Sequence, residues 1–410
     1  MDIYGNTKIK GNFMFHNYTV DNINEMAEEI NYLRRYSIYR NSDIALMPDA
    51  HKGKAHASVG FVATYKDKII PATCGVDIAC RVSAYHIYAD DIDFEQLDKV
   101  IHERVPSGHS IRSVEHELSV KFPYDELRCW NAIKDNEERY RKSMGTLGQG
   151  NHMIEVDQSH DGTCYLIIHT GSRNLGVMVA NYYQSKGIAA RDQRIKDIYD
   201  RYEQAIAVER EEGHFDQIQS LLDGRKVEIL SQPENDLCYI EGQDMEDYLH
   251  DMDMLRFWSF DNHQVIAYEI FNGMGWDMFE HFSSIHNYVD TENHIIRKGA
   301  IAAYEGQLGI IPLNMASGSL IVRGKGNEDY LCSAPHGAGR VMSRKAARLN
   351  IDMADYQKAM EGIYTTSVCN DTLDEAPQSY KDAGAIIAAI QPTVDIIEHV
   401  RPRYNFKAKN

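Results

Sequence analysis

The residues best suited to chemistry begin with a carboxylate and a thiol beside one turn. In the segment CGVDIACRV, Asp77 and Cys80 are three positions apart. One local bend could therefore direct a carboxylate and a thiolate toward the same point. Taken alone, this segment fits equally well a buried structural cysteine beside a turn aspartate.

Three histidines also lie beside turns or at strand ends. His152 follows Asn151 after a loop with three glycines in six residues, His169 closes the apolar run YLIIH, and His286 precedes Asn287. A glycine-rich loop is a weak indication of phosphate binding by itself. A histidine that closes a buried strand is more often a core residue than a ligand, so each segment leaves both interpretations open.

Together these segments supply one carboxylate, one thiolate and three imidazoles. Such a set suits Mn, Fe, Co or Zn, whereas Mg and Ca sites do not recruit sulfur. Because a thiolate can bridge two ions, five such ligands could hold a pair of ions with open positions for a substrate. The spacings are not those of zinc fingers, which argues against a closed structural zinc site.

A fifth segment, SAPHGAGRVMSRKAARLN, combines a histidine with positive charge. His336 lies in a His-Gly-Ala-Gly loop, and we expect a helix to begin at about Gly339, where free backbone N–H groups favour anions. Arg340 and Arg344 would then share one helix face. Between His336 and Asn350 there are four basic residues and no acid. The pattern favours a phosphate-binding site, and its alternative is a solvated charged helix.

The elements that would position these residues indicate an α+β fold. Short β-branched or aromatic runs predict strands at 44–48, 58–65, 81–87, 164–172, 294–304 and 319–326. Spacing of 3.6 residues predicts a helical insertion or lid over about 177–285 and a further helix over 384–402. Strands and helices do not alternate regularly, which argues against a doubly wound sheet.

Composition limits the class of protein. The 410 residues include 43 Lys and Arg against 61 Asp and Glu, a net charge of −18, which excludes binding nucleic acid by bulk charge but not through a local basic site. No apolar run approaches the ~18 residues of a membrane span. The start, MDIYGNTKIKGNF, has no apolar signal core, and the seven cysteines include no Cys-x-x-Cys pair. We therefore expect a reduced, cytoplasmic protein without membrane contact.

Ten segments in order along the chain resemble the RtcB family of RNA ligases. They are MPDAHKGK (47–54), GVDIAC (75–80), GNHMIE (150–155), HTGSRNLG (169–176), HNY (286–288), RKGA (297–300), GIIP (309–312), VRGKGN (322–327), HGAGRVMSR (336–344) and DEAP with Tyr380-Lys381. The resemblance covers nearly the whole chain and implies a single α+β domain over residues 1–410.

The resemblance implies a residue-by-residue assignment. Two Mn²⁺ ions would be bridged by Cys80, one also bound by Asp77 and His152, the other by His169 and His286. His336 would be the nucleophile that takes GMP from GTP. Apart from the resemblance, we expect the basic residues Arg173, Arg340 and Arg344 to bind RNA phosphates. The residues expected to contact GTP are Asn151, His152, Met153, Ile154, Glu155, His286, Asn287, Pro312, Leu313, Asn314, Met315, Ser319, His336, Gly337, Ala338, Gly339, Tyr380 (by stacking) and Lys407.

The implied reaction joins an RNA 3′-phosphate or 2′,3′-cyclic phosphate to a 5′-hydroxyl, in tRNA splicing or RNA repair, with an archease-type protein as a possible helper. The chain departs from the family pattern at several positions: Ala79 and Arg81 replace glycines, Ile285 replaces a histidine, Pro335 replaces a common serine, and residues 312–319 differ. These departures favour a divergent paralogue.

Two other classes of function fit the same residues. A dinuclear metallophosphoesterase acting on RNA ends would use the five ligands without needing His336. A non-enzymatic RNA-end-binding protein would keep the basic segment alone, but the retained His336 and Cys80 speak against it.

Overall fold

The computed structural model describes residues 15–20, 23–34, 37–39, 42–53, 57–89, 91–277 and 280–409. Residues 1–13, where the sequence shows no apolar signal core, lie outside the described residues, and so does Lys54 of the MPDAHKGK segment. Helices and sheets are mixed in one architecture, so the predicted α+β class is confirmed. Within the described ranges, no helix combines the length and the apolar character that crossing a membrane requires.

A seven-stranded sheet is the largest among the described residues, and it carries most of the residues singled out above. Its order is β13-β14-β16-β6-β7-β5-β9. The strands are β5 (Cys80–Ile87), β6 (Met153–Gln158), β7 (Cys164–Thr170), β9 (His281–His286), β13 (Leu308–Asn314), β14 (Gly318–Gly324) and β16 (Val394–Phe406).

Smaller sheets lie beside this one. A five-stranded sheet in the described chain has the order β1-β2-β3-β11-β10, and β12 pairs with β15 and β4 with β8. These strands are β1 (Phe15–Asn17), β2 (Ile44–His51), β3 (Val59–Thr64), β4 (Lys68–Ile69), β8 (Ile240–Glu241), β10 (Tyr288–Asp290), β11 (Ile295–Lys298), β12 (Ala300–Ala302) and β15 (Ser333–Pro335).

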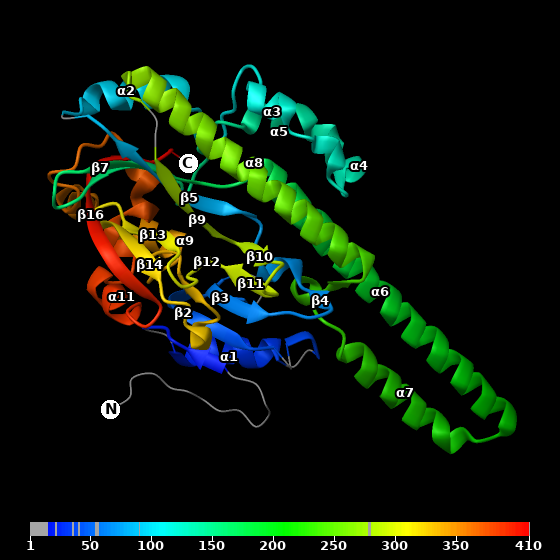
Figure 1. Cartoon of the computed structure of the whole chain (residues 1–410). Coiled ribbons are helices and arrows are strands. Elements are labelled where there is room, and N and C mark those ends of the chain that lie inside the picture. Colours follow the sequence, from blue (N-terminus) through cyan, green and yellow to red (C-terminus); the bar gives the residue numbers. More distant parts are fainter. Residues whose placement is uncertain are drawn as a thin grey trace, which may run out of the picture.

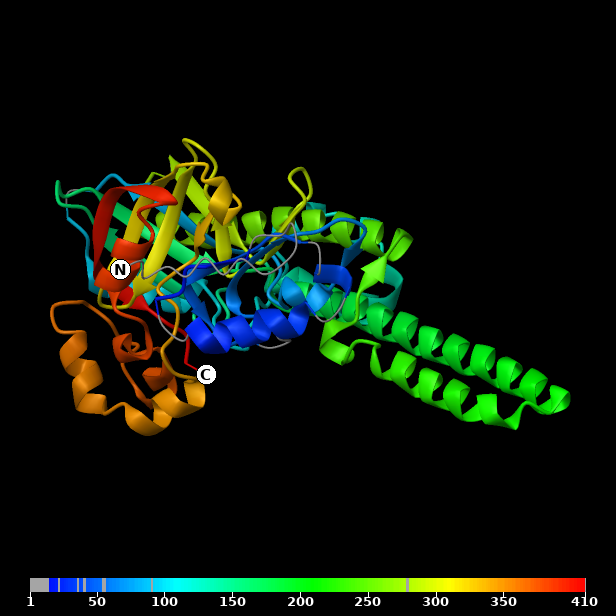
Figure 2. The same cartoon turned by 90° about the horizontal axis from the view of Figure 1, so that it is seen from below.

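Three long helices occupy most of the region predicted to be helical over about 177–285, but from His281 onward that region forms strand β9. They are α6 (Arg173–Glu212), α7 (Phe215–Leu230) and α8 (Gln243–Met274). The α6–α7 hairpin extends away from the body, whereas α8 runs along the sheets (Figures 1 and 2). Leu255, Trp258 and Ile266 of α8 are fully buried, with the spacing of one helix face.

The remaining helices are short. The α-helices are α1 (Ile23–Leu33), α2 (Phe94–Arg104), α3 (Glu117–Lys121), α4 (Trp130–Ile133), α5 (Glu137–Ser143), α9 (Arg344–Asn350), α10 (Met353–Ala359) and α11 (Ala383–Ala389). The 3₁₀ turns are η1 (Ser37–Tyr39), η2 (Pro71–Thr73), η3 (Tyr124–Glu126), η4 (Lys134–Asn136), η5 (Asn235–Leu237), η6 (Glu328–Tyr330), η7 (Asn370–Glu375) and η8 (Pro377–Ser379).

The two faces of the seven-stranded sheet pack differently. Ile154 and Ile168 on the outer face join the hydrophobic core that includes Ile266 of α8. Met153 and Ile167 on the inner face join a smaller apolar cluster. Because side chains alternate along a strand, the two histidines at the ends of β7 and β9 also fall on the inner face.

Two further helix predictions were wrong in part. The expected helix over 384–402 ends at Ala389, and from Val394 onward that segment is strand β16, which pairs with β14 and β6 in the middle of the sheet. Its backbone groups are needed for that pairing, which overrides the local helical pattern. The helix expected from about Gly339 begins only at Arg344, after an N-cap at Ser343 whose hydroxyl accepts from the N–H of Ala346.

Candidate metal centre and adjoining cleft

Three adjacent strands bring the candidate metal ligands together. Cys80, the first residue of β5, pairs with His286, the last residue of β9. On the other side of β5, Val82 pairs with His169 near the end of β7. Cys80 and Val82 share a face, so the thiol and both imidazoles meet at one end of the sheet. His152 directly precedes β6, where Met153 pairs with His169.

Three hydrogen bonds hold the loop before β5. Ala79 has a φ of 57°, a left-handed conformation that is unusual for alanine. Its N–H donates to the carbonyl of Asn287 at 2.9 Å, and its carbonyl accepts from the Ser259 hydroxyl of α8 at 2.7 Å. The Asn287 amide also donates to the carbonyl of Asp77 at 3.1 Å. These contacts fix the direction of the Asp77 and Cys80 side chains.

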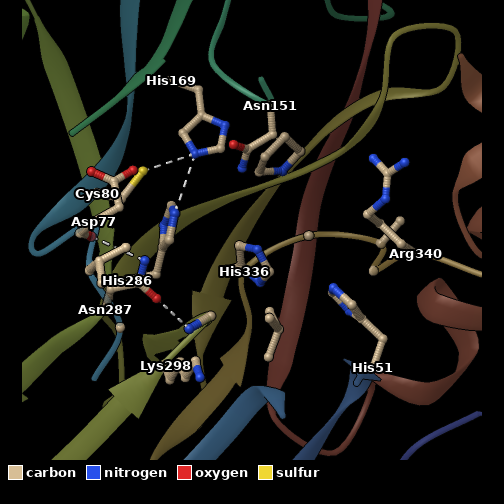
Figure 3. A pocket seen from close by; sticks show the side chains of 18 of the residues that line it. His51, Asp77, Cys80, Asn151, His169, His286, Asn287, Lys298, His336 and Arg340 are labelled. Atoms are coloured by element: carbon tan, nitrogen blue, oxygen red, sulfur yellow. Dashed lines mark hydrogen bonds between the residues drawn. The ribbon is translucent and has the colours of Figure 1, made fainter. Parts of the chain in front are cut away.

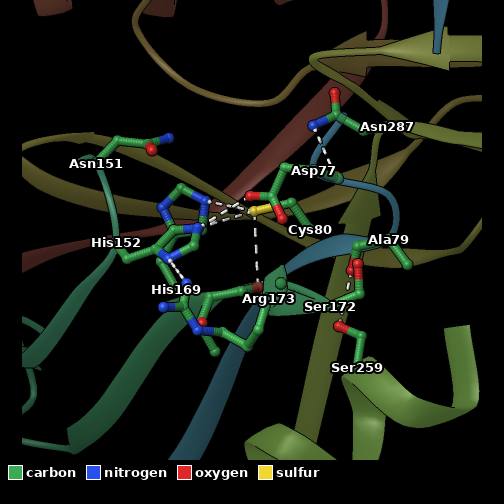
Figure 4. Close-up of polar contacts among 12 residues, drawn as sticks. Asp77, Ala79, Cys80, Asn151, His152, His169, Ser172, Arg173, Ser259 and Asn287 are labelled. Atoms are coloured by element: carbon green, nitrogen blue, oxygen red, sulfur yellow. Dashed lines mark hydrogen bonds and ion pairs between the residues drawn. The ribbon is translucent and has the colours of Figure 1, made fainter. Parts of the chain in front are cut away.

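The five predicted ligands form two groups that share one sulfur atom, and we call them the donor cluster. One group is Asp77, Cys80 and His152, and the other is Cys80, His169 and His286; the donor atoms within each group lie within 4.8 Å of one another. The Cys80 Sγ is 3.3 Å from His169 Nε2 and 3.7 Å from His152 Nε2 (Figures 3 and 4). A carboxylate, a thiolate and three imidazoles arranged in this way fit a pair of borderline divalent ions bridged by sulfur.

The protein orients these imidazoles and keeps two of them neutral. His152 Nδ1 is 2.9 Å from the carbonyl of Leu147, and its Nε2 is 3.0 Å from Asp77 Oδ2. Burial, together with neighbouring histidines, lowers the pKa of His169 and of His286 well below the usual value. Neutral imidazoles are the form that binds metal.

The thiol of Cys80 depends on a cation for its ionisation. Burial, reinforced by the Asp77 carboxylate, raises the pKa of Cys80 well above the usual value. A divalent ion at Sγ would reverse this effect, since a coordinating thiol is deprotonated outright. Ionisation of Cys80 is therefore expected to accompany metal binding.

His336 lies beside the donor cluster and is oriented by a carboxylate that the sequence did not single out. The rings of His336 and His286 are 4.8 Å apart between centroids (Figure 3). His336 Nδ1 is 2.7 Å from Oδ2 of Asp49, a fully buried residue of β2. A carboxylate only accepts hydrogen bonds, so Nδ1 carries the proton and Nε2 keeps its lone pair. The only available signal for Asp49 was its place in the MPDAHKGK segment.

Gly339 allows the loop that contains His336 to lie close to Asp49 of β2. Gly339 has a φ of 74°, and a Cβ atom there would lie 2.0 Å from the carbonyl oxygen of Asp49. The His-Gly-Ala-Gly segment is therefore a close packing site for strand β2 and not the start of a helix. The predicted helix-terminus anion site at His336 was wrong, because α9 begins only at Arg344.

Three cations form one wall of the cleft, and we call Arg340, Arg344 and Lys407 the cationic wall. All three are ion-paired with the buried Glu375. Although burial opposes it, these three cations lower the pKa of Glu375 to about 2. Tyr380 donates from its hydroxyl to Glu375 at 2.5 Å, and its ring lies 5.2 Å from the Arg340 guanidinium. Arg340 and Arg344 thus share a carboxylate, not a helix face.

A cleft of about 560 Å³ connects the donor cluster, His336 and the cationic wall, a size that suits a nucleotide. Most predicted GTP contacts line it: Asn151, Met153, His286, Asn287, Pro312, Leu313, Asn314, Met315, His336, Gly337, Ala338, Gly339, Tyr380 and Lys407. The sequence reasoning assigned no role to two further lining residues, His51 and Lys298. Burial lowers the pKa of His51 to about 4, so its imidazole is neutral.

The remaining predicted residues lie behind the cleft wall. The Ile154 side chain belongs to the outer core, and Glu155 and Ser319 are buried on the inner face of the sheet. His152 faces the donor cluster. Arg173 lies behind His152, with its Nε donating to the Thr146 hydroxyl at 3.3 Å. A backbone contact or a rearrangement would be needed for Ile154 or Arg173 to reach a ligand in the cleft.

These features define an α+β protein with a candidate two-ion centre beside an oriented histidine. A family model described as tRNA-splicing ligase RtcB matches residues 36–129 and 124–408. The chain therefore belongs to the RtcB family.

Individual relatives agree with this assignment. The chain is 30% identical over 383 residues to the RNA-splicing ligase RtcB of Escherichia coli K12, covering 87% of this chain and 88% of the relative. It is 30% identical over 396 residues to RNA-splicing ligase RtcB1 of Escherichia coli ATCC 25922, with the same coverage. The tRNA-splicing ligase RtcB of Nanoarchaeum equitans is 25% identical over 434 residues, covering 84% of this chain and 83% of the relative.

Proposed function

We propose that this protein is a GTP- and Mn²⁺-dependent RNA ligase. It joins an RNA 3′-phosphate or 2′,3′-cyclic phosphate end to a 5′-hydroxyl end, in tRNA splicing or RNA repair. The relatives named as RNA-splicing and tRNA-splicing ligases support ligation of RNA. The observation that carries the mechanism is His336, which Asp49 orients beside the donor cluster.

The first step attaches GMP to the protein. The lone pair of His336 Nε2 attacks the α-phosphorus of GTP, a P–N bond forms, and pyrophosphate leaves with the electrons of the broken P–O bond. Asp49 holds the Nδ1 proton throughout and stabilises the positive charge that develops on the ring. Arg340, Arg344 and Lys407 offset the charge of the phosphates.

The next steps return His336 to its starting state. A cyclic phosphate is first opened by water to a 3′-phosphate, whose oxygen attacks the GMP phosphorus and breaks the P–N bond. The RNA 5′-hydroxyl oxygen then attacks the RNA 3′-phosphorus, GMP leaves, and the hydroxyl proton passes to solvent. Two Mn²⁺ ions, held by the donor cluster, would polarise the phosphoryl oxygens during these transfers.

Covalent labelling tests this proposal. Incubation with α-labelled GTP and Mn²⁺ should label the wild-type protein, with a bond that acid cleaves and base leaves intact. His336→Ala should abolish labelling while metal content stays normal, because His336 is not in the donor cluster. His160→Ala removes an exposed imidazole and is the matched control. Normal labelling of His336→Ala would overturn the mechanism. RNA phosphatase activity without any labelling would favour the metallophosphoesterase.

A further inference from the structure

Four polar side chains are buried together on the inner face of the seven-stranded sheet, away from the cleft wall. Glu155 and Asp157 come from β6, Ser319 from β14 and Asn405 from β16. Each is at most 1% exposed. Buried polar groups of this kind normally have hydrogen-bond partners.

The strand register places the four on one face. Asn405 pairs with Glu155 and Pro402 pairs with Asp157, on either side of a bulge in β16. The β16 residue two positions before Pro402 pairs with Ser319. Because a bulge absorbs one extra residue, Asp157, Ser319 and Asn405 all point inward. The site is therefore built from three neighbouring strands.

Several oxygen atoms of this group lack a partner. Among the residues that the structure describes, neither carboxylate oxygen of Asp157 has a hydrogen bond, nor does Ser319 Oγ or Asn405 Oδ1. Glu155, by contrast, accepts from the amide nitrogen of Asn405. Leaving such buried groups unsatisfied is costly, and the carboxylate and carbonyl oxygens can only accept. A ligand that suits them must be a cation or a hydrogen-bond donor.

The ionisable groups at this site also favour a cation as the ligand. Burial raises the pKa of Glu155, although Lys407 and the Asn405 amide favour its charged form. Asp157 has no ion pair in the described part of the chain. Burial, with Glu155 as its neighbour, raises the pKa of Asp157 well above the usual value, and the Ser319 hydroxyl opposes this shift. Without a cation the Asp157 carboxyl group therefore holds a proton, which a bound cation would replace.

We propose that Asp157, Ser319 and Asn405 coordinate one monovalent cation, Na⁺ or K⁺, as a structural site inside the sheet. The donors are all oxygen, which suits a hard cation and differs from the sulfur- and nitrogen-containing donor cluster. The single carboxylate charge of Asp157 matches a monovalent ion.

Thermal unfolding at constant ionic strength tests the site. Replacing choline chloride with KCl or NaCl should raise the melting temperature of the wild type by about 3 °C at a hundredfold excess over the dissociation constant. Asp157→Asn should abolish this response, because the amide removes the charge. Asp161→Asn, an equal charge change in the exposed turn after β6, should leave the response intact. Asp157 has no part in the proposed ligation, so the result does not depend on that activity.

A direct measurement covers the case in which Asp157→Asn fails to fold. Wild-type crystals soaked with Tl⁺ or Rb⁺ should show an anomalous peak at the Asp157 carboxylate. A melting temperature that is equal in choline and potassium, with no such peak, would overturn the proposal. In that case a proton on Asp157 or a buried water molecule neutralises the group.

Discussion

The donor cluster and the cationic wall face each other across one cleft but are built differently. The donor cluster joins the ends of neighbouring strands, so the sheet register alone brings Cys80, His169 and His286 together. The cationic wall joins residues distant in sequence, Arg340, Arg344 and Lys407, around the buried Glu375. The donor cluster contains one carboxylate, Asp77, among thiol and imidazole groups, whereas the cationic wall places three cations around one carboxylate.

This difference explains why one region was predicted and the other was partly misread. Donor chemistry depends on residue type, and strand ends are visible as apolar runs followed by turns. A cluster of arginines, however, does not reveal which carboxylate will pair with it. The basic run from Arg340 to Arg348 contains no acid in sequence, yet its three arginines form ion pairs with Asp374 or Glu375 in space.

The largest expected effect lies in the donor cluster. Cys80→Ala should lose both metal ions and all ligation, because its sulfur belongs to both ligand groups. His286→Ala should weaken mainly one ion. Metal analysis of the purified variants measures this difference, and retention of two ions in Cys80→Ala would refute the bridging role.

The next effect concerns the contact that orients His336. Asp49→Asn can reverse the hydrogen bond at Nδ1 and so favour the wrong tautomer, as in other carboxylate–histidine pairs. We expect the rate of GMP labelling to fall about 10²–10⁴-fold. Metal content should be unchanged, because Asp49 lies outside the donor cluster. Asp67→Asn, in an exposed turn, controls for the loss of charge. A labelling rate equal to wild type would remove Asp49 from the mechanism.

The ion pairs between Glu375 and the cationic wall should make the stability of the protein depend on pH. The folded protein holds the pKa of Glu375 at about 2, below its usual value of 4.5. Its contribution of about 3 kcal/mol to the free energy of unfolding is therefore complete above pH 4.5 and is lost as pH falls toward 2. Glu375→Gln should lower the free energy of unfolding at pH 7 and reduce its decrease between pH 4.5 and 2. Denaturant titrations between pH 2 and 7 measure the free energy of unfolding. An equal decrease in the variant and the wild type would contradict the assignment.

The smallest effect separates two similar arginines. Arg344 and Arg348 both pair with Asp374, and their side chains are 44% and 47% exposed. Only Arg344 of the two lines the cleft. Arg344→Ala should reduce the slope of log affinity against log salt for a 3′-phosphorylated RNA by about 0.7, the value for one phosphate contact on a single strand. Arg348→Ala should leave the slope unchanged, and equal slopes in both variants would show that neither touches RNA.

The fold was predictable where local pattern and tertiary role agree. The strands that carry Cys80 and His169 are apolar runs bounded by turns, and the long helices between Arg173 and Met274 lie in the segment predicted to be helical. The helix prediction for the segment 384–402 was wrong because the second half of the segment is a strand in the middle of a sheet. There, hydrogen bonding to two neighbouring strands outweighs the local helical pattern.

The sequence by itself determined which chemical groups this protein offers: five candidate metal ligands, a histidine in a glycine-rich loop, nearby arginines and membership of the RtcB family. Only the tertiary structure decided which groups meet. It placed Asp49 on His336, Glu375 among three cations, and Asp157 in the sheet interior without a partner. Residue types are written in the chain, whereas pairing and burial depend on contacts between segments up to hundreds of residues apart, which no local pattern encodes.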